Sequence, residues 1–273
     1  MSAHPWRRLP ALFSLVLLAA IVLLSAFASV LYPAGPWPNV GDPLIEPFTS
    51  RFAPLGTDTL GRDVAAELVH GARVSLVVGI VATAAALLIG VSIGAVAGYA
   101  RGWIDDVLMR FTELFQAVPS FILLIVLVVL LGPSIVTIII GIAVVSWPPI
   151  ARLVRGEFLS LSTREFVQSC RVIGVPPIRI IFFEILPNCV APIIVTGSIM
   201  VASAILLEAG LSFLGLGDPN VISWGAMVAV GRPLLRSATY LSVIPGMAIL
   251  LTVLSINLFG EALNEALSGQ KRR

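Results

Sequence analysis

The stretch Thr163–Asn188 reads TREFVQSCRVIGVPPIRIIFFEILPN and holds five charged residues. The segments on either side differ sharply from it, because residues 114–151 and 185–207 contain no Asp, Glu, Lys or Arg. Charged side chains are costly inside a lipid bilayer. The pattern therefore predicts a polar loop outside the membrane, held between apolar segments that cross it.

The composition of the whole chain agrees with a membrane protein. The 273 residues are 58% hydrophobic and 12% charged, whereas a soluble domain carries about 25% charged residues. The fold class that we expect is all-α integral membrane. Two cysteines give no disulfide framework, and His4 and His70 lie far apart in the sequence, so we expect no histidine-based metal site.

Charge-free runs locate the membrane spans, because a helix needs about 20 apolar residues to cross the hydrocarbon layer. The run 114–151 is too long for one span, and Gly132-Pro133-Ser134 divides it at a turn signal. The count is six spans, at about 9–31, 74–99, 115–131, 134–150, 188–207 and 239–259. We treat the chain as a single transmembrane domain, 1–273.

The basic residues predict the orientation of these spans. Both termini and the loops 100–113 and 151–187 together carry 12 Lys and Arg, against 5 on the opposite side. The positive-inside rule therefore places both termini and the loop 151–187 in the cytoplasm, and the loop 32–73 outside the cell. An alternative for residues 1–31 is a cleaved secretory signal, because Ala26-Phe27-Ala28 imitates a cleavage site, although the apolar run is long for one.

Within the opening stretch, the spacing predicts two short helices with a bend. Ser162 and Glu165 have the spacing of a capping box, so a helix should begin there. Gly174 is a natural stop, and Pro176-Pro177 prevents simple continuation. A second helix is expected over Ile178–Ile185. The first helix is amphipathic, which leaves two hypotheses open: it lies on lipid headgroups, or it docks in a groove of a soluble partner.

The stretch resembles the cytoplasmic coupling loop of ABC importer permeases. Gly174, Leu186 and Pro187 match the family pattern, whereas Gln168-Ser169-Cys170 replaces its Glu-Ala-Ala and Glu184 replaces its Ile. Two further stretches, PLGTDTLGRDVAAELVHGARVSL at Pro54–Leu76 and EAGLSFLGLGDPNVISWGAMV at Glu208–Val228, resemble the permeases of the dipeptide, oligopeptide and nickel branch. Together they resemble the second of the two permease subunits in that branch.

The resemblance implies the six-span fold of type I importer permeases, with a helix-turn-helix coupling loop between spans 4 and 5. It implies half of a translocation path for short peptides, in a bacterial or archaeal cell membrane. The implied partners are a homologous second permease, cytoplasmic ABC ATPase subunits and an extracytoplasmic substrate-binding protein. The chain should not be an enzyme and should carry no cofactor. In agreement, its one lysine, Lys271, follows Gln270, so there is no P-loop to bind ATP.

The expected contacts with the ATPase lie on the first helix of the loop. Phe166, Val167 and Ile173 are expected to be buried anchors, and Gly174 allows the bend. The complete set of predicted coupling residues is Arg164, Glu165, Phe166, Val167, Cys170, Arg171, Ile173 and Gly174.

Glu208, at the outer end of the fifth span, is a candidate contact on the substrate path, because ionisable residues within spans are often functional. The alternatives are an ion pair with Arg232 or Arg236, or a cap at the Gly210 turn. Substrates other than peptides, such as nickel or other small solutes, stay open. An ion-coupled secondary transporter is a further alternative, although no ionisable residue lies at the centre of a predicted span.

A stripe of small residues at four-residue spacing follows the second predicted span. Gly79, Gly90, Gly94 and Gly98 belong to it, with Ala82 and Ala86 between them. Small residues allow helix backbones to approach closely. The stripe therefore predicts a tight packing surface, against either a partner permease or another span of this chain.

Overall fold

The computed structural model describes residues 5–270, and the side chains of residues 11–266. This part of the chain is helical, with two isolated β-bridges in the loop before α3. The helices are α1 (Pro5–Ala26), α2 (Ala28–Leu31), α3 (Val64–Ala100), α4 (Gly102–Ala117), α5 (Ser120–Leu131), α6 (Ile135–Leu161), α7 (Glu165–Val172), α8 (Pro177–Arg179), η1 (Ile180–Ile185), α9 (Leu186–Phe213), α10 (Trp224–Gly231), η2 (Arg232–Leu234) and α11 (Tyr240–Gln270).

Four helical segments among the described residues are long and apolar enough to cross a membrane. They are Val64–Ala100, Ile135–Leu161, Pro177–Phe213 and Tyr240–Ala266. A fifth span results if the bent pair α4 and α5 is counted as one. The segment Ala11–Ala26 of α1 is apolar but shorter. The chain is thus a multi-pass helical membrane protein.

The third predicted span, 115–131, is not one straight helix. The helix α4 continues to Ala117, α5 begins at Ser120, and the two axes differ by 82°. Pro119 causes the break, because it has no N–H to donate and forces the preceding residue out of the helical region. Val118 accordingly has the extended angles φ −99° and ψ 132°.

The other long helices extend past the apolar runs that predicted them. The helix α6 covers the predicted span 134–150, stays helical through Pro148-Pro149, and continues beyond the span to Leu161. The predicted loop 151–187 therefore begins as helix rather than as loop. Counting charge-free residues finds the part of a helix that suits hydrocarbon, and misses the turns that carry charges beyond it.

The small-residue stripe packs against another span of this chain. A Cβ atom at Gly90, Gly94 or Gly98 would come within 2.4–2.7 Å of α6 atoms, and one at Gly79 would come within 2.8 Å of Ile205 in α9. Real Cβ contacts essentially never fall below 3.0 Å. The glycines are therefore what allows α3 to cross α6 and α9 at this distance.

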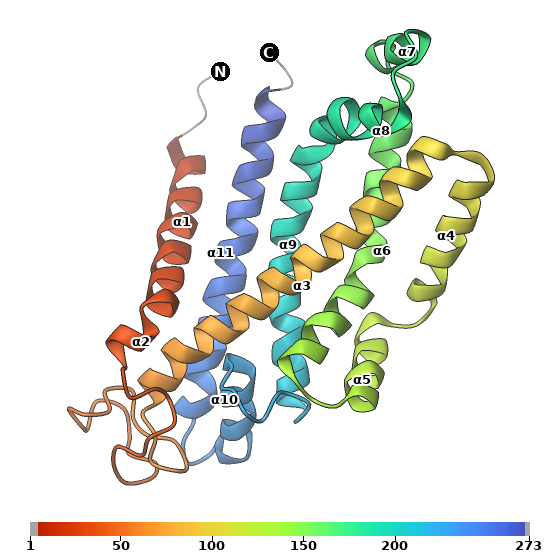
Figure 1. Cartoon of the computed structure of the whole chain (residues 1–273). Coiled ribbons are helices and arrows are strands. Elements are labelled where there is room, and N and C mark those ends of the chain that lie inside the picture. The colour runs from red at the N-terminus through yellow and green to blue at the C-terminus, as the bar shows by residue number, and fades with distance from the viewer. Residues whose placement is uncertain (1–4, 271–273) are drawn as a thin grey trace.

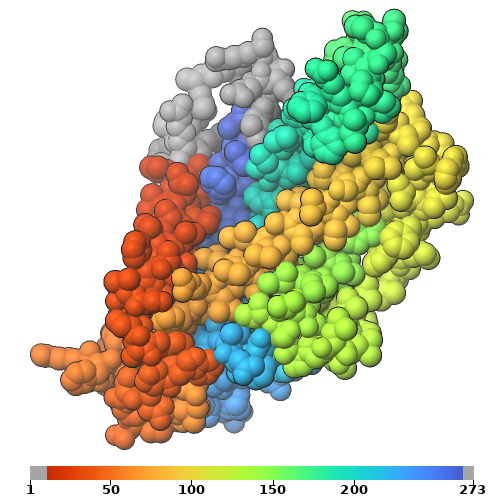
Figure 2. Space-filling model, viewed as in Figure 1, coloured from red at the N-terminus to blue at the C-terminus, as the bar shows by residue number. Residues whose placement is uncertain are grey.

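Figure 1 shows how these elements are arranged. α7 and α8 lie at one end of the molecule, together with the start of α1 and the end of α11. α10 and the loop between α2 and α3 lie at the opposite end. We call these the α7 end and the α10 end. In the space-filling view the α2–α3 loop projects sideways beyond α1 (Figure 2).

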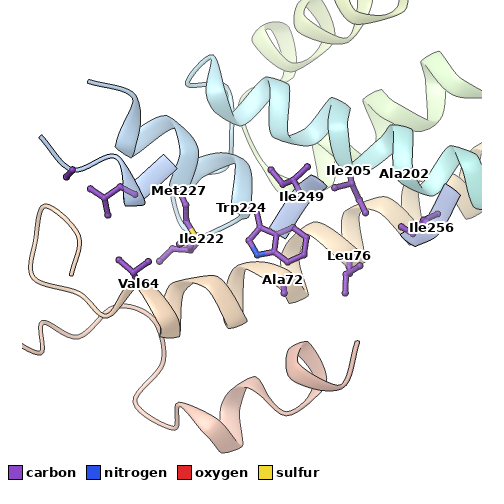
Figure 3. Packing of buried hydrophobic residues seen from close by; sticks show 12 residues of the cluster. Val64, Ala72, Leu76, Ala202, Ile205, Ile222, Trp224, Met227, Ile249 and Ile256 are labelled. Atoms are coloured by element: carbon purple, nitrogen blue, oxygen red, sulfur yellow. The ribbon is translucent and has the colours of Figure 1, made fainter. Parts of the chain in front are cut away.

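Buried apolar side chains connect the helices at both ends. At the α10 end, Trp224 lies beside Ala72 of α3, and Ile222 lies near Val64 at the start of α3 (Figure 3). At the α7 end, a separate cluster joins α6, α7, η1 and α9 around Phe158, Val167, Ile180, Ile185 and Cys189, each at most 1% exposed. We call this second set the α7-end cluster.

Candidate functional site

The junction between α6 and α7 is held by Ser162. Its hydroxyl donates to the Leu159 carbonyl (3.1 Å) and accepts from the Arg101 guanidinium (2.7 Å). Its own carbonyl accepts from the Gln168 side-chain amide (2.9 Å). The capping box predicted for Ser162 and Glu165 is therefore wrong: α7 begins with Arg164 as its N-cap, and no side chain caps it. Ser162 instead ends α6, where it is completely buried.

Val167 seats α7 on the rest of the chain. Its side chain is 0% exposed and packs in the α7-end cluster with Phe158, Ile180 and Ile185. This corrects the prediction that Val167 is an anchor in a groove of another protein, because the residue is already enclosed by its own chain. The physical reason is that η1 packs against α7, and its Ile180 and Ile185 lie in the same cluster as Val167.

The other predicted coupling residues divide into a group with exposed side chains and a group that contacts the rest of the chain. Phe166 and Ile173 are 39% and 78% exposed, so they are free to meet a partner. Arg164 and Glu165 are exposed as well, and Cys170 is half-buried against the α7-end cluster. The guanidinium of Arg171 lies 5.0 Å from the centre of the Tyr99 ring, in the range of a cation–π contact.

Gly174 ends α7 as the sequence predicts. Its φ of +81° is in the left-handed region, where a residue with a β-carbon is strained. The Val175 N–H donates to the Cys170 carbonyl and the Gly174 N–H donates to the Arg171 carbonyl. These two bonds form a Schellman motif, which satisfies carbonyls that the end of the helix leaves open.

Polar contacts that sequence reasoning missed brace the same end. Arg155 of α6 donates two hydrogen bonds to Asp105 of α4, at 2.5 and 2.6 Å. Arg101 donates to both Leu159 and Ser162 at the end of α6. The ends of α3, α4 and α6 are thereby tied together next to α7. The partners lie 50 to 61 positions apart in sequence, so no local pattern announces them.

Glu208 lies at the α10 end and is 3% exposed. Its carboxylate accepts from Ser223 (2.6 Å), Ser212 (2.7 Å) and Ser75 (3.3 Å). The structure shows these hydroxyls rather than the ion pair considered with Arg232 or Arg236. Arg232 instead lies over the Phe213 ring, 5.2 Å from its centre.

The serines around Glu208 attach the short helix α10 to the long helices. Ser223 also accepts from the Ala226 N–H, so it caps α10 while it donates to Glu208. Ser75 of α3 also accepts from the Trp224 N–H (3.3 Å). One buried carboxylate thus connects α3, α9 and α10. Buried carboxylates require such partners, because a charged group without them is strongly destabilising.

The loop before α3 is fastened to α11. The Tyr240 hydroxyl lies 3.1 Å from the Ile45 carbonyl and 2.7 Å from the Thr57 carbonyl. Beside it is a cavity of about 270 Å³, whose lining includes Trp37, Arg62 and Met227. Among the residues that the structure describes, no three His, Cys, Asp or Glu side chains come together to hold a metal ion.

Asp218 connects the α9–α10 loop to the start of α6. Its carboxylate accepts from the backbone N–H groups of Asn220 (2.9 Å) and Ile135 (3.0 Å). Partial burial works to raise the pKa of Asp218, but the hydrogen bonds from Asn220 and Ile135 outweigh it and the pKa lies below its usual value.

Comparison with known proteins gives a consistent family. Residues 90–273 match the family described as "Binding-protein-dependent transport system inner membrane component". The chain is 38% identical to the di/tripeptide transport system permease protein DppC of Pseudomonas aeruginosa, over 94% of this chain and 87% of that protein. It is 35% identical to the oligopeptide transport system permease protein OppC of Bacillus subtilis, over 96% of this chain and 86% of that protein.

A solved structure shares the fold. It shows inward-facing conformations of the MetNI methionine ABC transporter, with a TM-score of 0.62 and 19% sequence identity over 73% of this chain and 95% of that chain. The helical architecture, the family match and the full-length relatives agree with the resemblance noted in the sequence. The chain therefore belongs to the binding-protein-dependent transport system inner membrane components, the permease subunits of ABC importers, and is a transport subunit rather than an enzyme.

Proposed function

We propose that the chain is one of two permease subunits in an ATP-driven importer, and that it forms half of the translocation path for short peptides. The observation that carries this proposal is the 35–38% identity, over more than nine-tenths of the chain, to permeases named for dipeptides, di/tripeptides and oligopeptides. The alignment covers the α7 end as well as the α10 end, so it is not limited to one motif.

In the proposed topology, α1 with α2 is a first span and the bent pair α4 and α5 is the third, which makes six. The start of α1, the end of α11 and α7 share one end of the molecule (Figure 1). That arrangement supports an even number of crossings, and the basic residues favour the cytoplasm for this end.

The proposed coupling element is α7. Phe166 and Ile173 offer apolar contacts to a groove of a cytoplasmic ABC ATPase subunit, and Arg164 and Glu165 lie beside them. Val167 acts from a different face, because it fixes α7 to the α7-end cluster. Movement of the ATPase would then reach α6 and α9 through packed side chains rather than through a flexible loop.

At the α10 end we propose that the loop before α3 meets the substrate-binding protein. The bonds from Tyr240 hold this loop in one conformation, which suits a docking platform. Glu208 is less suited to the substrate contact considered for it, since its carboxylate is enclosed by three serines. We expect it to position α10 instead.

Reconstitution tests the proposal. The chain is purified with the neighbouring permease, ATPase subunits and binding protein, and placed in liposomes. Uptake and ATP hydrolysis are then measured with dipeptides, longer peptides, glutathione and nickel chelates. Peptide-stimulated hydrolysis with uptake supports the proposal. Stimulation by a nickel chelate alone would assign a different substrate, and uptake driven by an ion gradient without any ATPase would assign the chain to a different class of transporter.

A further inference from the structure

The connection between α8 and α9 contains a wide helical turn. In the π-helical segment η1, Ile180–Ile185, the chain stays helical, but the Leu186 N–H donates to the carbonyl of Ile181, five residues earlier. An α-helix would use the residue four positions earlier. Such single wide turns inside helices are rare and are frequent at functional sites. This one lies between the coupling helix α7 and the membrane helix α9.

Pro187 stands directly after the wide turn. It has no N–H to donate, and in an α-helix its ring would clash with the Phe183 carbonyl four residues earlier. Widening the turn moves that carbonyl away from the ring. The neighbouring Glu184 carbonyl accepts from the Asn188 side-chain amide (2.7 Å). Pro192 provides a comparison within α9, because the chain remains α-helical around it.

The wide turn decides which side chains face the α7-end cluster. Ile180 and Ile185 are 1% and 0% exposed, and both pack in that cluster. Five residues of α-helix, at about 100° each, would leave them about 140° apart around the axis. A turn closed by a bond from residue i+5 brings them to the same side. Phe182 and Phe183, at 54% and 74% exposed, lie on the outer side.

We propose that Pro187 is a positioning residue for coupling. The wide turn that it imposes sets the angle between α9 and residues 165–185, which carry α7 and which we call the arm. This inference rests on the proposed function, since it takes α7 as the contact with the ATPase. In an α-helical η1, Ile180 or Ile185 would leave the α7-end cluster, and Val167 would lose the surface that seats α7. The arm would still be present and α7 would still be helical, but it would point elsewhere.

The test compares Pro187→Ala with the matched control Pro192→Ala, in the complete transporter reconstituted in nanodiscs. The geometric measurement is a spin-label distance between the exposed positions Val172 in α7 and Ile194 in α9. The native Cys170 and Cys189 are first replaced by Ala.

We expect Pro187→Ala to shift or broaden the distance distribution, and Pro192→Ala to leave it unchanged. In the same preparations we expect Pro187→Ala to lose substrate stimulation of ATP hydrolysis while it keeps the basal rate, and Pro192→Ala to keep both.

An unchanged distance distribution in Pro187→Ala overturns the inference, and so does full substrate stimulation. A second variant combines Pro187→Ala with deletion of Phe183: in an ordinary α-helix Ile180 and Ile185 would then be four positions apart, about 40° around the axis, and the label distance should return to its wild-type value. A distance that stays shifted in this double variant also overturns the inference. The proposed function fails separately, if uptake by the wild-type complex does not require ATP hydrolysis, because the label distances are measured without transport.

Discussion

Gly94→Ala is expected to separate α3 from α6, because the glycine faces backbone rather than a flexible side chain. A Cβ atom there would lie 2.4 Å from the Ala151 carbonyl oxygen and 2.9 Å from Val154 Cβ. Ordinary contact begins at 3.4 Å, so the helices must move apart locally by about 1 Å. A gap of that size forfeits roughly a quarter to a half of the dispersion energy of each contact it opens.

The expected loss follows from these distances. Overpacking of a well-packed interface costs about 1–3 kcal/mol, and the higher helix propensity of alanine offsets at most about 1 kcal/mol. Gly156 in α6 is the matched control, because a Cβ atom there meets nothing within 4 Å. We expect Gly156→Ala to be neutral or slightly stabilising, which leaves a difference between the two variants of about 2 kcal/mol.

The measurement is thermal unfolding of each full-length variant in the same detergent, followed by circular dichroism. A difference of about 2 kcal/mol corresponds to roughly 4–8 °C in Tm for a chain of this size. Equal Tm values for Gly94→Ala and Gly156→Ala would refute the reasoning, because they would show that α3 and α6 do not depend on this close approach.

Three further changes have defined outcomes. Gly174→Asp places a side chain at a φ of +81° in open space, so the cost is backbone strain of about 1–2 kcal/mol. We expect this variant to reach the membrane in normal amounts but to show ATP hydrolysis without uptake. Normal uptake would count against docking through α7. Asp105→Asn weakens the bonds to Arg155 and should lower the unfolding free energy by about 1–2 kcal/mol, whereas Asp106→Asn, at an exposed site, should not change the Tm. Folding lowers the pKa of Asp218, so its charge stabilises the fold above the ordinary pKa of 3.8, and this stabilisation disappears as the pH falls through the lower folded value. The Tm difference between wild type and Asp218→Asn should hold between about pH 8 and pH 5 and vanish in acid. A Tm difference independent of pH would exclude the charge as its cause.

Local backbone chemistry was the most predictable part of the molecule. Gly174 and Pro176-Pro177 predicted a helix end and a bend, and the chain has both. The break at Pro119 follows from the same rules, although the span 115–131 was predicted without it. Its signal was present in the sequence, since a residue before proline avoids the helical region.

Side-chain partners from distant segments could not be predicted in this way. Ser162 has the spacing of a cap, but Arg101 and the end of α6 occupy its hydroxyl. Glu208 looked like an interfacial or substrate-facing carboxylate until the fold brought Ser75 and Ser223 to it. Val167 belongs to the same class, because the apolar face of an amphipathic helix does not name the surface that covers it.

The enclosure of Val167 has a mechanical consequence. A helix that merely rested on the ends of its neighbours could be pressed inward but would lift off when pulled. Val167 is 0% exposed and packs in the α7-end cluster, so pulling α7 away would expose its apolar side chain to water and is resisted, as compression is. A protein bound to α7 could therefore move this end of the chain in either direction, by pushing or by pulling.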